Sequence, residues 1–174
     1  MCGIVGLFLK KDDLRPRLGD LLTDMLITMT DRGPDSAGIA IYGDDADGLK
    51  MTIQSETPDK DFDGLEETLT ALLRSPVRMR AVDTHAVLTL PKGSEAETRA
   101  FLAEKNIRVM GVGHSMEIFK EVGLPGDVAA RFGIRQMAGS HGIGHTRMAT
   151  ESAVTTLGAH PFSTDGDQCL VHNG

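Results

Sequence analysis

The sequence has no tryptophan, one tyrosine and only two cysteines among its 174 residues. With so few aromatic side chains it lacks the stacking platforms that bind single-stranded nucleic acids. Its 18 basic and 25 acidic residues give a formal charge of −7, and no basic cluster exceeds a few residues. A surface that follows a phosphate backbone is therefore not expected. Together these shortages argue against nucleic acid as a partner.

Long apolar runs are also missing. No stretch approaches the roughly 18 to 20 apolar residues needed to cross a bilayer, and the N-terminus lacks the basic and then apolar pattern of an export signal. We therefore expect a cytoplasmic protein with no membrane partner. In a reducing cytoplasm Cys2 and Cys169 are not expected to form a disulfide. Cys169, inside an apolar run, is expected to be a buried strand thiol.

The residues that are present are sufficient for one well-packed domain with an inserted unit, since 40% of them are hydrophobic. Apolar residues alternate with glycines over 4–8 and predict a strand. Apolar spacing over 14–29 predicts a core helix that ends before Gly33 and Pro34, followed by a short strand over 39–42.

The middle of the chain, about 45–139, carries no recognisable catalytic pattern and is predicted to be an inserted α+β unit. The expected elements are strands over 50–55, 78–90 and 107–112, helices over 62–73 and 94–105, and a helical stretch with turns over 115–132. His85 and His114 lie within it. Their spacing does not fit a metal site, so we expect hydrogen-bonded or solvent-facing side chains.

Cys2 is the first candidate for chemistry. If Met1 is removed, its thiol stands beside its own free amine. An unperturbed α-amine titrates near ~7.7 to 8.0 and a thiol near ~8.5, so one residue could serve as both nucleophile and base. A cysteine at position 2 is by itself usually incidental, and the inference depends on distant residues.

Further candidates lie at the ends of predicted strands in the last 35 residues, where a rigid sheet presents side chains to a pocket. A strand and polar turn over 141–150 precede His160 and Pro161, and a strand over 169–171 leads to 172–174. Arg32 and Asp35 lie in a turn rich in glycine and proline. They are either surface charges or a brace for that turn, and spacing alone leaves both open.

Five stretches, in this order, resemble the glutaminase domain of class II glutamine amidotransferases, which are N-terminal nucleophile hydrolases: 2–6, 32–38, 144–150, 160–161 and 172–174. They lie within the first 44 and the last 35 residues or so. The resemblance implies an α+β, four-layer αββα fold with two facing antiparallel sheets between helical layers. It implies one type-2 glutamine amidotransferase domain over 1–174, interrupted by the inserted unit.

The resemblance also implies roles for single residues. Cys2 would be the nucleophile, and the Asn173 side chain and the Gly174 backbone N–H would form the oxyanion hole. Arg147 would hold the α-carboxylate of glutamine, with a hydroxyl contact from Thr150. No metal is implied. The remaining residues of these motifs that we expect to support the site are Arg32, Asp35, His145 and His160.

The reaction implied is hydrolysis of glutamine to glutamate and ammonia, which would pass to a synthase on another chain. The layout is similar to separate amidotransferase subunits of the glutamate synthase and N-methylglutamate synthase group. That likeness implies no cofactor in this chain and a partner carrying FMN and an iron–sulfur cluster. Two alternatives stay open: another N-terminal-cysteine amidase, which would not need Arg147, and a catalytically inactive regulatory or assembly subunit.

Three features depart from the family. Its domains continue beyond the His-Asn-Gly strand, so we expect this chain to be C-terminally incomplete. Met148 replaces a bulky aromatic residue, and Glu151 stands where several relatives have histidine. An acidic side chain there would weaken glutamine binding unless it turns away or pairs with the substrate ammonium.

Overall fold

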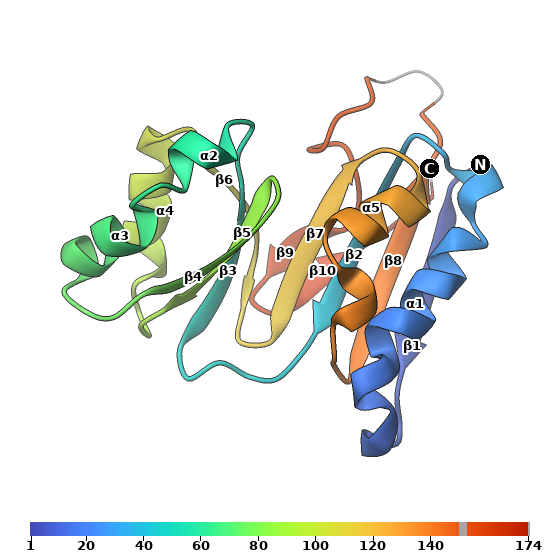
Figure 1. Ribbon diagram of the computed structural model, residues 1–174, viewed down its shortest axis with the longest axis horizontal. Helices are drawn as coiled ribbons and strands as arrows, with labels where there is room; N and C mark the ends of the chain where they lie inside the picture. Colours follow the sequence, from blue (N-terminus) through green and yellow to red (C-terminus); the bar gives the residue numbers. More distant parts are fainter. Residues whose placement is uncertain (150–152, 174) are drawn as a thin grey trace.

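The computed structural model describes residues 1–149 and 153–173. Within these ranges the chain forms two four-stranded antiparallel sheets, a two-stranded hairpin and five α-helices. The fold is mixed α+β, as the sequence predicts (Figure 1). No helix in this part of the chain combines the length and the apolarity needed to cross a bilayer.

The first sheet brings the start of the chain against its last third. Its strand order is β1-β8-β2-β7, with every neighbouring pair antiparallel. In the register of β1 with β8, Gly3 lies opposite Thr146. The residue before β1 is therefore held beside the residues that follow β8. The strands are β1 (Gly3–Phe8), β2 (Ser36–Tyr42), β7 (Met116–Val122) and β8 (His141–Arg147).

Two helices, α1 (Leu18–Ile27) and α5 (Pro125–Arg131), cover one face of this sheet (Figure 1). Glycine on β8 lets α1 approach closely, since a Cβ on Gly144 would lie 2.8 Å from Leu26 Cδ1. Burying one leucine is worth roughly 1.5–3 kcal/mol, so the buried leucines of α1 hold β8 firmly in place. The fully buried leucines of the predicted stripe are Leu18, Leu22 and Leu26.

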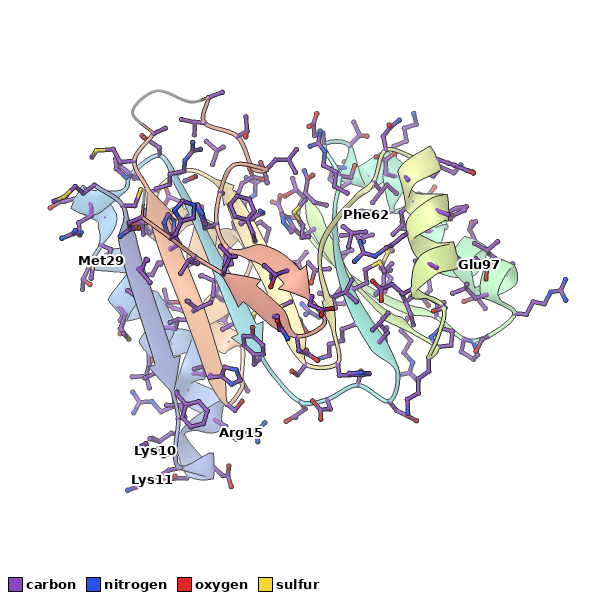
Figure 2. All side chains as sticks on the ribbon, turned by 180° about the vertical axis from the view of Figure 1, so that it is seen from behind. Lys10, Lys11, Arg15, Met29, Phe62 and Glu97 are labelled. Carbon is purple, nitrogen blue, oxygen red and sulfur yellow. The ribbon has the colours of Figure 1, made fainter. Side chains whose placement is uncertain are left out.

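The other face of the first sheet packs against the hairpin of β9 (Phe162–Asp165) and β10 (Gln168–Leu170) (Figure 2). Cys169 on β10 is half buried, and its sulfur lies 3.4 Å from the Tyr42 hydroxyl oxygen. Burial raises the pKa of this thiol. Because both faces of the sheet are covered, β2 is buried along nearly its whole length.

The second sheet has the order β4-β5-β3-β6 and a hydrophobic core of its own, beneath α3 and α4 (Figure 1). Its elements are β3 (Leu49–Gln54), α2 (Pro58–Asp61), α3 (Leu65–Leu73), β4 (Arg78–Val82), β5 (His85–Leu90), α4 (Glu95–Glu104) and β6 (Arg108–Gly113). Short 3₁₀ helices are Asp12–Arg17, Thr30–Arg32 and Ile134–Gln136.

Three elements of the middle segment differ from the prediction. Residues 116–122 form strand β7, not a helix; both of its faces are covered, which hides the alternation of polar and apolar residues. The strand expected over 78–90 is a hairpin that turns at Asp83, with φ +54°. The helix expected over 62–73 begins only after Gly64, with φ +64°. Segment 45–139 is therefore divided between the two sheets, because β7 belongs to the first sheet and α5 to the helical layer that covers it.

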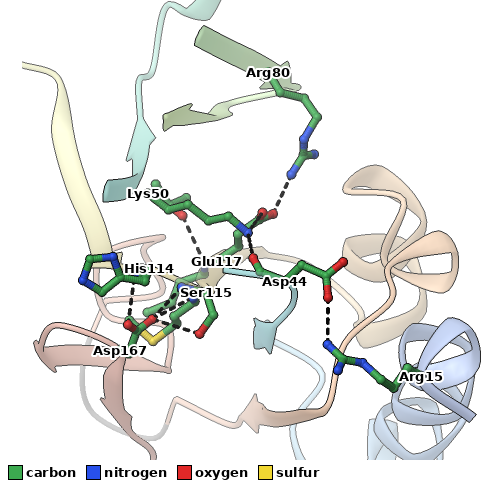
Figure 3. A network of polar contacts seen from close by, with 11 residues as sticks. Arg15, Asp44, Lys50, Arg80, His114, Ser115, Glu117 and Asp167 are labelled. Atoms are coloured by element: carbon green, nitrogen blue, oxygen red, sulfur yellow. Dashed lines mark hydrogen bonds and ion pairs between the residues drawn. The ribbon is translucent and has the colours of Figure 1, made fainter. Parts of the chain in front are cut away.

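Polar contacts around the β6–β7 turn join the hairpin and the second sheet (Figure 3). Asp167, between β9 and β10, accepts backbone N–H bonds at 2.7–2.9 Å from His114 and Ser115 of the turn and from Met116, the first residue of β7. Nearby, Glu117 of β7 forms ion pairs with Lys50 and Arg80 of the second sheet. These contacts fix the hairpin that leads to the last described residues.

Candidate active site

Cys2 stands at the entry to β1, where the pairing of β1 with β8 fixes its position. Its side chain is half buried, and its sulfur lies 3.9 Å from the carbonyl oxygen of Met148. Its own carbonyl oxygen accepts hydrogen bonds from Arg32 Nε and Asn173 Nδ2, both at 3.3 Å. Met1 is 79% exposed, with its amine 3.2 Å from Met148 Sδ. Residues of three other motifs therefore meet at Cys2, so four of the five motifs come together there.

Asn173 follows β10 and brings the far end of the described chain beside its start (Figure 1). Its Oδ1 lies 3.1 Å from Nε2 of His145 on β8. The same imidazole nitrogen lies 3.1 Å from the carbonyl oxygen of His172. The Asn173 amide thus bridges β8 and the Cys2 backbone, with its nitrogen toward Cys2.

Three histidine rings pack together next to this amide. The ring centroids of His145 and His160 are 4.3 Å apart, and those of His160 and His172 are 4.9 Å apart. Burial lowers the pKa of His145. Burial, with His145 and His172 as neighbours, lowers the pKa of His160 to about 4. Near pH 7 the His145 and His160 rings are uncharged and contribute packing and hydrogen bonds rather than charge.

Lys120 of β7 is a supporting residue that sequence reasoning misses. Its side chain is buried, and Nζ donates to the carbonyl oxygens of Ala159 at 2.8 Å and Pro161 at 3.2 Å, with Leu157 at 3.5 Å. This ammonium holds the turn that carries His160. The helix expected over 115–132 hides the role, because only a strand places position 120 on the face toward the hairpin.

Arg147 ends β8, and its guanidinium lies beside the loop that follows residue 152. Its Nη1 donates to the carbonyl oxygen of Ala153 at 3.3 Å, and a Cβ on Gly158 would lie 3.0 Å from that nitrogen. The sequence-predicted residues Thr150 and Gly174, and also Glu151, lie outside the described residues. Of the expected carboxylate-binding pair, only Arg147 can therefore be placed.

Arg32 and Asp35 contact the backbone at two different strand ends, just before β1 and just after β8. Arg32 reaches the Cys2 carbonyl oxygen, whereas Asp35 Oδ2 accepts the N–H of Ala149 at 2.7 Å. Between them, a Cβ on Gly33 would lie 2.4 Å from the carbonyl carbon of Thr146, so the turn needs glycine to lie against β8. Of the two readings left open by the sequence, the contacts favour a brace, one that joins the start of β1 to the end of β8.

The arrangement gathers groups suited to acyl transfer around the junction of β1 and β8. A thiol can attack a carbonyl carbon, an amide N–H can stabilise the developing oxyanion, and a guanidinium can hold a carboxylate. A separate cavity of about 420 Å³ lies beyond Lys120, between β6 and β9, and is lined by Arg99 and Phe162 among others. None of the predicted site residues that the structure describes lines it.

Comparison with known proteins finds relatives named for glutamine amidotransfer. The chain is 64% identical over 177 residues to the glutamine amidotransferase-like protein GlxB of Rhizobium meliloti, covering 100% of this chain and 58% of the relative. It is 35% identical over 191 residues to a putative glutamine amidotransferase of Methanothermobacter thermautotrophicus, covering 100% of this chain and 61% of the relative. No protein-family model matches.

A shorter match reaches glutamine–fructose-6-phosphate aminotransferase of Streptococcus mutans, with 50% identity over 58 residues, 33% of this chain and 9% of that enzyme. These similarities support a glutamine amidotransferase domain in this chain. The chain spans about three-fifths of the length of the two relatives that it matches throughout.

Proposed function

We propose that this chain is the glutaminase part of a class II glutamine amidotransferase, with an N-terminal-nucleophile fold. It hydrolyses glutamine to glutamate and ammonia through a thioester on Cys2, after removal of Met1. The observation that carries the proposal is the hydrogen bond from Asn173 Nδ2 to the Cys2 carbonyl oxygen. It places a side-chain amide beside the candidate nucleophile, although 171 positions separate the two residues.

In the proposed reaction the free amine of Cys2 takes the thiol proton, and sulfur attacks the side-chain amide carbon of glutamine. The tetrahedral oxygen accepts bonds from the Asn173 amide and the Gly174 N–H. An amide nitrogen carries two N–H bonds, so Asn173 can keep its bond to Cys2 and use the second for the oxyanion. The amine returns its proton to the departing nitrogen, which leaves as ammonia. Water then cleaves the thioester to glutamate and the free thiol.

Arg147 would bind the α-carboxylate of glutamine through its planar guanidinium, with a hydroxyl contact from Thr150. Its position at the end of β8, two residues beyond His145 and close to the Cys2 entry, supports this role. The remaining supporting residues would keep the strand ends in register: Arg32, Asp35, His145 and His160.

In the proposed domain, the first sheet, its helical layer and the β9–β10 hairpin are three of the four layers, with β3–β6 and their helices inserted between β2 and β7. The inserted sheet contributes no group to the proposed chemistry. Ammonia would pass to a partner synthase. The partner that we favour is a flavin-dependent chain with FMN and an iron–sulfur cluster.

The test is glutamine turnover by the protein as it is made in its own cell, with variants at Cys2 and Arg147. We expect Cys2→Ala to abolish glutamate formation and Arg147→Ala to raise KM for glutamine at least 10-fold. Arg78→Ala, an exposed arginine on β4, is the matched control and should leave both constants unchanged. Wild-type protein without glutaminase activity in its native complex would instead support a regulatory or assembly subunit.

Arg147 also separates the proposal from another N-terminal-cysteine amidase. Such an enzyme needs the thiol and the asparagine but no group for an α-carboxylate. Profiling glutamine against acylated amines with wild type and Arg147→Ala distinguishes the two. Equal loss on both substrate classes would contradict the glutamine assignment, whereas selective loss on glutamine supports it.

A further inference from the structure

We propose that His145 is a positioning residue that sets the orientation of the Asn173 amide, so that its nitrogen and not its oxygen faces Cys2. This inference rests on the proposed function, in which that nitrogen stabilises the oxyanion. It is carried by two hydrogen bonds at opposite ends of one amide. Nδ2 lies 3.3 Å from the Cys2 carbonyl oxygen, and Oδ1 lies 3.1 Å from His145 Nε2.

The donors and acceptors allow one arrangement. The Cys2 carbonyl oxygen can only accept, so the amide must present Nδ2 to it, and Oδ1 then points to His145. Oδ1 can only accept, and so can the His172 carbonyl oxygen on the same imidazole nitrogen. His145 must therefore carry its proton on Nε2. Its Nδ1, left as an acceptor, is buried without a hydrogen-bond partner among the described residues.

The His145 ring, which sets this orientation of the Asn173 amide, is itself held in place. His145 is 1% exposed, lies between β1 and β2, and is covered by the ring of His160 at 4.3 Å. The turn with His160 can lie this close because Gly38 stands opposite His145: a Cβ there would lie 2.0 Å from the His160 carbonyl oxygen. Lys120, also opposite Gly38, holds the same turn through its carbonyl oxygens.

Without a donor at Nε2, the amide loses one of the two hydrogen bonds that set its orientation, and only the bond from Nδ2 to the Cys2 carbonyl oxygen still favours it. The two ends of an asparagine amide are nearly equal in shape, so it can turn by 180° and present Oδ1 to the Cys2 carbonyl oxygen. Turned this way it offers no N–H to the oxyanion. Losing one oxyanion donor typically lowers turnover by ~10² to 10³. A partial loss of orientation should lower it by at least 10-fold, with KM nearly unchanged because Arg147 binds the substrate elsewhere.

Two substitutions of similar size separate positioning from packing. In His145→Gln the side-chain amide can place an N–H where Nε2 stood, whereas in His145→Asn it reaches only the position of Nδ1. We expect kcat to fall no more than about 5-fold in His145→Gln and at least 10-fold in His145→Asn, with similar melting temperatures. Equal kcat in the two variants would overturn the inference.

A second readout does not depend on activity. Long-range ¹H–¹⁵N correlation spectra of the wild-type protein report which imidazole nitrogen of His145 bears the proton. We expect the proton on Nε2 and, in His145→Asn, a shift of the Asn173 side-chain amide signals. A proton on Nδ1 would overturn the inference. If the wild type has no glutaminase activity, the proposed function fails while these spectra still decide the role of His145.

Discussion

Single residues of this site act largely by holding the backbone of other motifs. Asp35 accepts the N–H of Ala149 just beyond β8, and its own N–H donates to the carbonyl oxygen of Arg147. Arg32 and Asn173 hold the Cys2 carbonyl oxygen in the same way. A hydrogen bond to a charged group is worth about 1.5–3 kcal/mol. Replacing Asp35 should therefore alter substrate binding at the end of β8 without touching the nucleophile.

Asp35→Ala should raise KM for glutamine several-fold and lower stability by about 1.5–3 kcal/mol, because the end of β8 loses its anchor. Asp35→Asn keeps an acceptor and should recover most of both. Steady-state kinetics and urea denaturation measure the two effects, with exposed Asp59→Ala on α2 as the control. An Asp35→Ala enzyme with unchanged KM would remove the bracing role.

The helices and strands differ in how well the sequence predicts them. Helix α1, which covers the middle of the helix predicted over 14–29, and the strand at the N-terminus follow from periodicity, because each has one buried face. The start of the predicted helix instead belongs to the 3₁₀ helix Asp12–Arg17. Strand β7 does not, since layers on both sides bury it. The motifs locate Cys2 and Asn173 as candidates, but the hydrogen bond of Asn173 to His145 spans 28 residues and no local pattern encodes it.

Lys120 connects two elements of the fold through its buried ammonium. Its ammonium joins β7 to the turn of residues 157–161, and Lys120→Met keeps the apolar stem while leaving buried carbonyl oxygens without their donor. We expect a loss of about 2–4 kcal/mol in unfolding free energy, together with a lower kcat because His160 no longer holds its position. Burial lowers the pKa of Lys120 to about 8. The cost of burying the ammonium therefore offsets part of the stability that its hydrogen bonds contribute.

The control for this variant is Lys92→Met. Lys92 is 74% exposed at the side chain and pairs with Asp47 at 3.5 Å, and such surface pairs contribute about 0–1 kcal/mol. Its unfolding free energy should change by less than about 1 kcal/mol. If the two methionine variants lose the same stability, the three carbonyl contacts of Lys120 are not a brace.

At the scale of the whole molecule, buried histidines link folding to pH. Burial lowers the pKa of His85 to about 4, where it packs against Phe119 and Phe132 between the two sheets. In the unfolded chain the same group titrates near ~6.5. The unfolded state therefore binds more protons between these values, and acidification favours unfolding. The same sign applies to His160.

We therefore predict that the histidine contribution to stability is complete above pH ~6.5 and is lost progressively as pH falls toward 4, with His85 contributing about 3 kcal/mol of the loss. His85→Leu cannot take up a proton and should flatten this part of the profile. Urea denaturation at a series of pH values measures it. A profile of His85→Leu parallel to the wild type would contradict the assignment.

Mass spectrometry tests directly whether Cys2 is the nucleophile, when it is applied to the protein purified from its own cell before and after treatment with the glutamine analogue 6-diazo-5-oxonorleucine. We expect a chain that lacks Met1 and takes up one label, located on Cys2 and absent from Cys169. A chain that retains Met1, or that takes up no label on Cys2, would contradict it.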